Sequence, residues 1–337
     1  MQTALTTRIL SPDREGVGAA AACLAAGGLV AFPTETVYGL GADAANPAAV
    51  ARIYQAKGRP SFNPLIAHVE NLAAARAVGR FNADAMRLAE AFWPGPLTLV
   101  LPKAPHCAVA DLATAGLDTV AIRVPVHPVA QAILAAFGQP VVAPSANLSG
   151  HVSPTSAAHV DSDLSGRVDL IIDGGPVAVG VESTIVGCFE QPLLLRPGGL
   201  PRAKIEAVLA RALAQPPADV AAESSQPLAP GMLASHYAPR TRVRLNATNC
   251  EPGEALLAFG SAPIPGQEAA AATLNLSSRG DVAEAATHLF GYLRELDATR
   301  AKAIAVMPIP NEGLGEAIND RLRRAAVERG FRKPREQ

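Results

Sequence analysis

The sequence lacks several features that would assign it to a common class of protein. Its 337 residues include 18% charged side chains with a formal net charge of -1, so no strong field would draw the whole molecule onto nucleic acid or acidic lipid. Aromatic residues make up only 4%. The P-loop, zinc-protease, nucleophile-elbow, protein-kinase and dinucleotide-binding motifs are all absent. Any anion-binding site must therefore be local and of another type.

Cysteines and long apolar runs are also scarce. The four cysteines lie far apart and form no CxxC pair, which argues against zinc and favours buried, reduced thiols (Cys23, Cys107, Cys188 and Cys250). The N-terminus has no charged head followed by an apolar core, and the longest apolar-rich runs are too short to span a bilayer. We therefore expect a cytoplasmic protein without a membrane segment.

What the sequence does contain is enough apolar surface for two α/β domains. Apolar residues make up 49% of the chain. Helix-like and strand-like segments alternate over residues 1–213, which predicts an α/β domain with a mixed sheet. Residues 214–240 lose this periodicity and are rich in Pro, Ala and Ser, as in a linker. Alternation resumes over 241–337 and predicts a smaller parallel-sheet domain of Rossmann-like topology.

Polar residues gather at the end of the first predicted buried strand. That strand ends at Pro33, and the Thr-Glu-Thr turn of residues 34–36 follows it, at a position where functional residues are common. His68 lies in the strand predicted over Leu65–Val69, in an apolar setting that suits a core histidine or a ligand contact. The turn is either a capped turn or part of a binding site.

A short helix predicted over Asn46–Gln55 leads to two cations. It has Asn at the cap position and Pro at the first helical position, and its apolar residues share one face. Lys57 and Arg59 follow on a segment that Gly and Pro keep out of regular structure. They are either solvated surface charges or the partners of a polyphosphate, for which Arg supplies bidentate geometry and Lys a point charge.

Arg123 is unusual because it lies inside an apolar strand, TVAIRV at 119–124. Strict alternation places the Val and Ile side chains on one face and Ala121 and Arg123 on the other. An unpaired charge there would cost several kcal/mol. Arg123 must therefore face either a structural carboxylate or a cavity that holds an anion, such as the carboxylate of an amino acid.

Three further segments could bind phosphate without a P-loop. The PSANLSG loop at 144–150 follows an apolar strand, so its hydroxyl, amide and backbone N–H groups could form a phosphate nest or merely a turn. The Ser183-Thr184 pair could likewise contribute to a phosphate nest or merely to a turn. Arg196, at the end of a predicted strand before Pro-Gly-Gly, resembles Lys57 and Arg59 in its setting.

In order along the chain, PTETVYGLG, KGRPSFNPL, FWPGPLTLVL, TVAIRVP, PSANLSG with SPT, GVEST and LRPG resemble the threonylcarbamoyl-AMP synthase family over about 20–205. The linker sequence APGMLASHYAP and the α/β domain after it resemble the long, two-domain form. The resemblance implies a YrdC-like α/β domain with a mixed twisted sheet at 1–213. It implies a linker that forms a lid over the active site at 214–240, and a smaller Rossmann-like α/β domain at 241–337.

The activity implied by the resemblance joins L-threonine, bicarbonate or CO2, and ATP with Mg2+ into threonylcarbamoyl-AMP, releasing pyrophosphate. The product serves N6-threonylcarbamoyladenosine modification of tRNA, so a partner could be the downstream tRNA-threonylcarbamoyl transferase machinery. The residues implied for L-threonine are Thr34, Thr36, His68, Arg123 and Ser183. Those implied for ATP are Lys57, Arg59, Asn63, Thr119, Ser145, Asn147, Ser153, Arg196 and Tyr237, the last as part of the lid.

No acid–base residue is assigned, because a carbamate is already anionic and can attack the α-phosphate without losing a proton. No protein metal ligand is assigned either. Two alternatives remain open at this stage. One is an RNA-binding module, against which stand the near-neutral charge, the few aromatics and the lack of a basic stripe. The other is a related carbamoyl-adenylate enzyme with a different acceptor.

Overall fold

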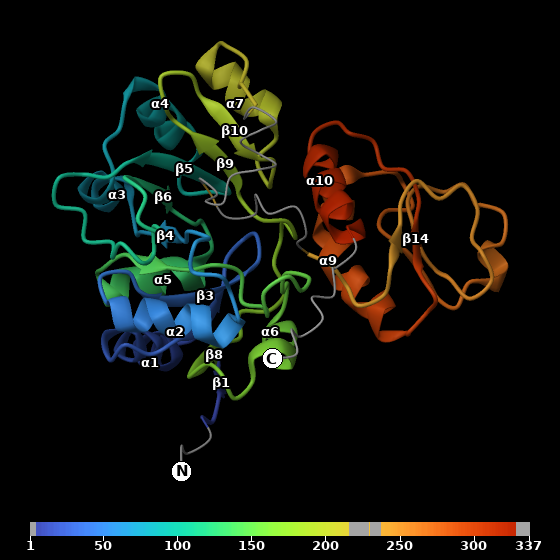
Figure 1. The fold of residues 1–337 in the computed structure, drawn as a ribbon, viewed down its shortest axis with the longest axis horizontal. Coiled ribbons are helices and arrows are strands. Elements are labelled where there is room, and N and C mark those ends of the chain that lie inside the picture. Colours follow the sequence, from blue (N-terminus) through green and yellow to red (C-terminus); the bar gives the residue numbers. More distant parts are fainter. Residues whose placement is uncertain (1–4, 216–228, 230–236, 328–337) are drawn as a thin grey trace, which may run out of the picture.

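The computed structural model describes residues 5–215, 229 and 237–327, which form two α/β units side by side (Figure 1). In the first unit, ten strands form one sheet in the order β1-β8-β2-β3-β7-β4-β6-β5-β9-β10. In the second, four strands pair in the order β11-β14-β12-β13, all in parallel. The larger sheet contains both parallel and antiparallel pairs, so the predicted mixed and parallel sheets are confirmed.

The strands of the first unit are β1 (Arg8–Leu10), β2 (Val30–Pro33), β3 (Tyr38–Asp43), β4 (Ile66–His68), β5 (Leu97–Pro102), β6 (Thr119–Arg123), β7 (Val141–Val142), β8 (Leu170–Ile172), β9 (Thr184–Gly187) and β10 (Leu193–Arg196). Its helices are α1 (Arg14–Ala25), α2 (Pro47–Lys57), α3 (Leu72–Val78), α4 (Ala83–Phe92), α5 (Pro128–Phe137), α6 (Ala157–Leu164) and α7 (Arg202–Leu209). The second unit contains β11 (Val243–Arg244), β12 (Ala255–Ala258), the short 3-10 helix η1 (Gln267–Ala269), β13 (Thr273–Asn275), α9 (Val282–Ala298), β14 (Ile304–Val306) and α10 (Gly315–Ala326).

Local sequence explains how α2 begins and ends. The Asn46 side chain accepts hydrogen bonds from the backbone N–H groups of Ala48 and Ala49, and Pro47 occupies the first turn, where it needs no donor. Gly58 ends the helix in the left-handed conformation with φ of 60°, which a residue without Cβ adopts at little cost. The predicted helix is confirmed, and its last residue is Lys57.

The strands β4, β6 and β5 place polar residues in one row across the sheet. His68 pairs with Arg123, Arg123 with Thr98, and Thr98 with Ile185, immediately beyond Ser183 and Thr184. Residues directly opposite one another in paired strands share a face. Their alternating neighbours on β6, Val120 and Ile122, lie in the main core on the other face, as the sequence predicts.

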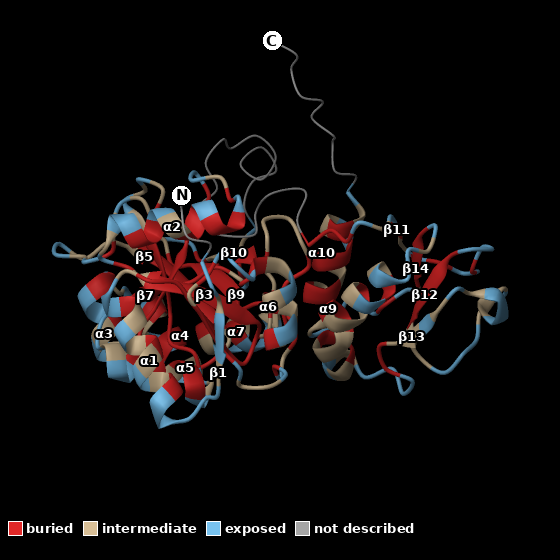
Figure 2. Ribbon diagram, turned by 90° about the horizontal axis from the view of Figure 1, so that it is seen from below, coloured by how far each residue is buried: buried red, intermediate tan, exposed pale blue. Residues whose placement is uncertain are grey.

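Apolar packing buries the central strands of both sheets, which are red in Figure 2, whereas the edge strands β1 and β13 are partly exposed. The main core of the first unit includes residues of α2, α4 and α7, and a second cluster packs α1 and α5 on β2 and β8. Figures 1 and 2 both show α9 and α10 between the two sheets, where they meet the first unit. Of the helices in the described ranges, none combines the length and apolar character that crossing a membrane requires.

Candidate functional site

One buried cavity collects most of the polar residues singled out in the sequence. It has a volume of about 50 Å3, and its lining includes His68 and Arg123 of the register row described above. Its lining includes nine of the predicted site residues: Thr34, Thr36, Arg59, His68, Arg123, Ser145, Ser183, Arg196 and Tyr237. These residues span more than two hundred positions of the chain, and the fold brings them to one place.

The Thr-Glu-Thr turn is held by its own hydroxyls. Thr34 Oγ1 donates to the Val37 carbonyl at 2.7 Å, and it lies 2.8 Å from Thr36 Oγ1. Because the Thr34 proton is used in this way, the Thr36 hydroxyl is the donor between the two. Both side chains are buried and line the cavity, so this turn is more than a cap.

Arg123 satisfies both alternatives left open by the sequence. Its Nη2 lies 2.6 Å from Glu35 Oε1, with the two side chains 4% and 8% exposed. Its Nη1 donates to Thr36 Oγ1 at 2.9 Å, and the residue also lines the cavity. A structural carboxylate therefore orients a guanidinium that faces a place for a ligand. Glu35 does not line the cavity and serves to hold the arginine.

His68 lies beside Arg123 and is uncharged near neutral pH. Its Nδ1 lies 3.1 Å from the Ile66 carbonyl. Burial, followed by the positive charge of Arg123, lowers the pKa of His68 to about 3. A neutral imidazole adds no second positive charge beside the guanidinium, which suits a ligand that carries an amino group as well as a carboxylate.

Ser183 and Arg196 form another wall of the cavity. Ser183 Oγ lies 2.7 Å from Thr98 Oγ1, while Arg196 donates through Nη2 to both the Ser183 carbonyl and Oγ, at 2.9 and 3.2 Å. The loop after Arg196 packs closely here, since a Cβ added at Gly198 would lie 2.4 Å from the Glu182 carbonyl. Glycine is therefore needed where this loop touches the backbone of the wall.

The two cations at the C-terminal end of α2, Lys57 and Arg59, differ in what they contact. Arg59 lines the cavity, and burial lowers its pKa to about 10, which leaves it charged near neutral pH. Lys57 Nζ donates to the backbone carbonyls of Ser145 (2.5 Å) and Asn147, and the lysine lies outside the cavity lining. Burial, then the charge of Arg59, holds the pKa of Lys57 well below its usual value. Lys57 thus fixes the PSANLSG loop from within.

Four other predicted nucleotide residues also lie outside the cavity lining. Asn63 and Asn147 are buried, and the Oδ1 atom of each has no hydrogen-bond partner among the described residues. Ser153 donates to Glu182 Oε1 at 2.5 Å. Thr119 lies at the start of β6, opposite Pro102, at the far end of the strand from Arg123. The fold therefore does not bring Thr119 to the cavity.

Tyr237 lies in one of the parts of the predicted lid that the structure describes. It is 1% exposed, lines the cavity, and stacks on Phe290 with ring centroids 5.7 Å apart. Residues 216–228 and 230–236, which include most of the predicted lid, lie outside the described residues.

Two further residues at the cavity were not singled out in the sequence as binding residues. Glu182 lines the cavity directly before Ser183, and Thr98 hydrogen-bonds to Ser183 from β5. Glu182 lies in the segment GVEST and Thr98 in WPGPLTLVL. The sequence therefore indicated these two segments as parts of the site, but it did not indicate these two side chains.

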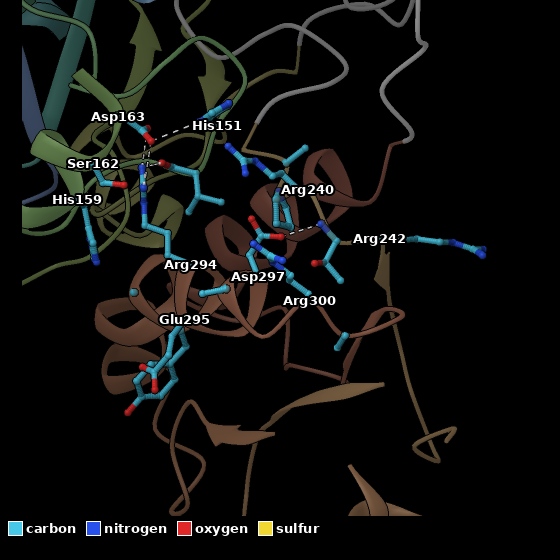
Figure 3. A pocket seen from close by; sticks show the side chains of 18 of the residues that line it. His151, His159, Ser162, Asp163, Arg240, Arg242, Arg294, Glu295, Asp297 and Arg300 are labelled. Carbon is cyan, nitrogen blue, oxygen red and sulfur yellow. Dashed lines mark hydrogen bonds and ion pairs between the residues drawn. The ribbon is translucent and has the colours of Figure 1, made fainter. Parts of the chain in front are cut away.

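A larger groove of about 1260 Å3 runs between the two units and shares no lining residue with the cavity (Figure 3). At one end, Arg294 from α9 forms an ion pair with Asp163 of α6 at 3.0 Å and donates to the Val152 carbonyl. His151 Nδ1 lies 3.4 Å from Asp163 Oδ1. These contacts fasten the second unit to the segment that follows the PSANLSG loop.

Two family models cover nearly all of the described chain. One, described as "Telomere recombination", matches residues 22–198. The other, described as "Threonylcarbamoyl-AMP synthase, C-terminal domain", matches residues 200–327. Together with the cavity, they place the chain among two-domain enzymes whose first domain has the YrdC-like fold.

Curated relatives and solved structures agree. The chain is 40% identical to threonylcarbamoyl-AMP synthase of Bacillus subtilis, with 96% of each chain covered. It is 43% identical to that of Pyrococcus abyssi, over 91% of this chain and 93% of the other. The crystal structure of P. abyssi Sua5 with L-threonine matches with a TM-score of 0.85 at 38% identity, covering 96% of this chain and 98% of that one. The chain belongs to the threonylcarbamoyl-AMP synthase family.

Proposed function

We propose that the cavity is where this chain makes threonylcarbamoyl-AMP from L-threonine, bicarbonate or CO2, and ATP, with release of pyrophosphate. The observation that carries the proposal is the buried Arg123, held by Glu35 and Thr36 with the cavity in front of it. A fixed guanidinium beside hydroxyls and a neutral imidazole fits the carboxylate, hydroxyl and amino groups of one small amino acid.

In this proposal L-threonine lies against Thr34, Thr36, His68, Arg123 and Ser183. Arg123 would bind the carboxylate, and the hydroxyl chain of Thr34 and Thr36 would bind the polar groups nearby. The crystal structure of P. abyssi Sua5 is a complex with L-threonine, which supports the same ligand in a chain that is 38% identical.

ATP would lie at the side of the cavity that Arg59, Ser145, Arg196 and Tyr237 line. Arg59 and Arg196 would neutralise phosphates, and the Tyr237 ring would contact the nucleotide. Lys57 would contribute by fixing the backbone of the PSANLSG loop rather than by direct contact, since its ammonium already meets two carbonyls. Thr119 has no contact with this side of the cavity that would support the same role.

The chemistry requires positioning and charge neutralisation more than acid–base groups. A carbamate formed on the threonine nitrogen would attack the α-phosphate in line with the departing pyrophosphate, and the arginines would stabilise the charge that develops on the phosphate oxygens. Arg59 and Arg196 are both buried, where a charge–charge interaction is screened less than in water.

We propose that Mg2+ enters as part of MgATP. No group of three His, Cys, Asp or Glu side chains that could hold a metal occurs within the described ranges. The unpartnered Oδ1 atoms of Asn63 and Asn147 are the kind of hard oxygen that accepts a hydrogen bond or binds Mg2+. These two amides fit a site for the phosphate end of MgATP, and bound Mg2+ would offset negative charge on the phosphates.

The product would pass to the tRNA-threonylcarbamoyl transferase machinery, and we place this work in the cytoplasm. The test is to incubate the protein with ATP, Mg2+ and bicarbonate, with and without L-threonine, and to measure pyrophosphate. Release that depends on threonine is expected, and L-serine or another amino acid in its place should give less. Release that is indifferent to threonine would contradict the proposal.

A further inference from the structure

The hydrophobic core of the second unit extends into the cavity wall of the first. Val37, Val152, Val181 and Tyr237 all pack in the same apolar cluster as Phe290 and the other core residues of α9 and α10. Two of these residues adjoin a residue that lines the cavity, since Val37 follows Thr36 and Val181 precedes Glu182. Val152 precedes Ser153, which hydrogen-bonds to Glu182. The second unit therefore packs directly against residues that line the cavity or adjoin its lining.

One side chain of the second unit reaches this wall directly. Arg321 of α10 is 0% exposed, although it lies in a basic helix that the sequence would place at the surface. Its Nε lies 2.8 Å from Glu182 Oε2, and its Nη2 donates to the Pro197 carbonyl at 3.0 Å. Its Nη1 lies 2.6 Å from Asp320, so the guanidinium is held on three sides.

Glu182 connects Arg321 to Ser153, which is one of the residues predicted to bind ATP. One of its oxygens meets Arg321, and the other accepts the hydrogen bond from Ser153. Burial would raise the pKa of Glu182, but the charges of Arg321 and Arg196 outweigh it and hold the carboxyl ionised. A buried carboxylate with both oxygens bound in this way has one favoured position.

Tyr237 is held in the same assembly. The Arg321 guanidinium lies 5.1 Å from the centre of the Tyr237 ring, and Phe290 stacks on the ring. The Tyr237 backbone has φ of 64°, a left-handed conformation that a bulky residue adopts only when its surroundings impose it. The contacts with Phe290 and Arg321 are such surroundings.

We infer that Arg321 is a positioning residue for the nucleotide side of the cavity. It holds the carboxylate of Glu182 and the ring of Tyr237 in the places where they line the site, so the second unit completes the ATP-binding wall. The inference rests on the proposed function for the identity of the nucleotide. It assigns to the C-terminal domain a direct part in ATP binding, transmitted through one arginine.

The test uses the full chain and four variants. Arg321→Lys keeps the charge but cannot make the three contacts, and Arg321→Met combined with Glu182→Gln removes both charges of the buried pair, in case the lysine variant does not fold. Arg202→Ala is the matched control, because Arg202 pairs with Glu316 between the same two units, away from the cavity lining. Tyr237→Ala shows what loss of the ring alone does. Each protein is checked by thermal unfolding.

We expect Arg321→Lys to raise the KM for ATP at least tenfold while the KM for threonine stays within twofold. ATP affinity measured by calorimetry, without threonine or bicarbonate, should fall by a similar factor. Arg202→Ala should change neither value by more than twofold.

An unchanged ATP affinity in a folded Arg321 variant would overturn the inference, and so would an equal loss in Arg202→Ala or an equal rise of both KM values. If the unaltered chain binds ATP but releases no pyrophosphate with threonine, the proposed function fails, while the ATP affinities still decide the role of Arg321. A chain that binds no ATP overturns both.

Discussion

The Nη2 atom of Arg123 lies 2.6 Å from Glu35 Oε1, in a pair that is almost completely buried. The arginine is therefore held in place before any ligand arrives, which reduces the ordering that binding would require. The pair also makes a simple deletion of the arginine ambiguous, because a lone buried Glu35 would itself destabilise the fold.

The first prediction concerns threonine recognition. Arg123→Ala combined with Glu35→Gln should lower kcat/KM for threonine at least about 100-fold, since a charge-assisted contact of about 3 kcal/mol is lost. Steady-state pyrophosphate release at varied threonine measures the effect, while ATP affinity should stay within about threefold. The control Arg52→Ala removes a half-exposed ion pair with Asp169, away from the cavity lining, and should leave the kinetics unaltered. A larger loss in ATP affinity than in threonine affinity would mean that the two ends of the cavity are reversed.

The second prediction concerns Tyr237. Tyr237→Ala removes the stacked ring and should weaken ATP binding more than threonine binding, whereas Tyr237→Phe keeps the ring against Phe290 and should retain most of the affinity. Loss of a base- or sugar-stacking ring costs about 1–3 kcal/mol, or roughly 5- to 150-fold in affinity. Calorimetric titration with ATP checks this. Equal effects of the Ala and Phe variants would assign the role to the hydroxyl instead.

The third prediction concerns acid stability and His68. The pKa of His68 is about 3 in the folded chain and about 6.5 for an ordinary, solvent-exposed histidine, so between these pH values the unfolded state binds the proton and the folded state does not. Protonation of His68 therefore does not reduce the free energy of unfolding above about pH 6.5. As the pH drops from 6.5 toward 3, the free energy of unfolding falls by up to about 1.4 kcal/mol per pH unit. Urea unfolding of His68→Gln should show a flatter pH dependence over this range. The exposed His106→Gln variant is the control and should keep the original slope.

The fourth prediction concerns Lys57. Lys57→Met keeps the apolar stem but leaves the Ser145 and Asn147 carbonyls without their buried donor, so the free energy of unfolding should fall by about 2–4 kcal/mol. Chemical denaturation measures the loss. Because the ammonium lies outside the cavity lining, the ATP affinity of the folded variant should fall less than that of Arg59→Met. The reverse order would show that Lys57 contacts the phosphates directly.

The fifth prediction compares two glycines. In Gly198→Ala the new methyl would lie 2.4 Å from three backbone atoms of Glu182, Ser183 and Thr184, so the wall must shift and both stability and activity should fall. Gly18 lies inside α1, and a Cβ added there meets nothing within 4 Å, so Gly18→Ala should stabilise the chain by about 0.5–1 kcal/mol. Thermal unfolding and pyrophosphate release distinguish the two. An active, stable Gly198→Ala protein would contradict the close packing of this loop.

Local sequence predicts much of this molecule. The Asn46-Pro47 start of α2 and the alternation in β6 depend on neighbours a few residues apart, and both are confirmed. The strand β3, Tyr38–Asp43, was not predicted, because two glycines interrupt its apolar pattern. Gly41 is nonetheless required there, since a Cβ would lie 2.7 Å from the Phe32 ring. The glycine that close packing requires in β3 is therefore also the residue type that makes the sequence resemble a loop.

Roles that depend on distant partners were harder to predict. The residue types at Lys57 suggest phosphate binding, whereas its partners lie 88 and 90 positions away in the backbone. Arg321 gives no local signal at all, because an arginine in a basic helix is normally solvated. Its partner Glu182 lies 139 positions earlier, and only the packing of two cores makes the pair visible.

The row His68–Arg123–Thr98, continued by β9 beside Ser183, links the site to the assembly of the sheet. A slip of one residue in any of these ladders would turn a polar side chain of the row into the apolar core. The β5–β9 ladder joins segments nearly ninety positions apart, so it closes a long loop and belongs with the slowly formed contacts. During refolding, helical structure should therefore return before catalysis, and recovered activity would report completion of the sheet.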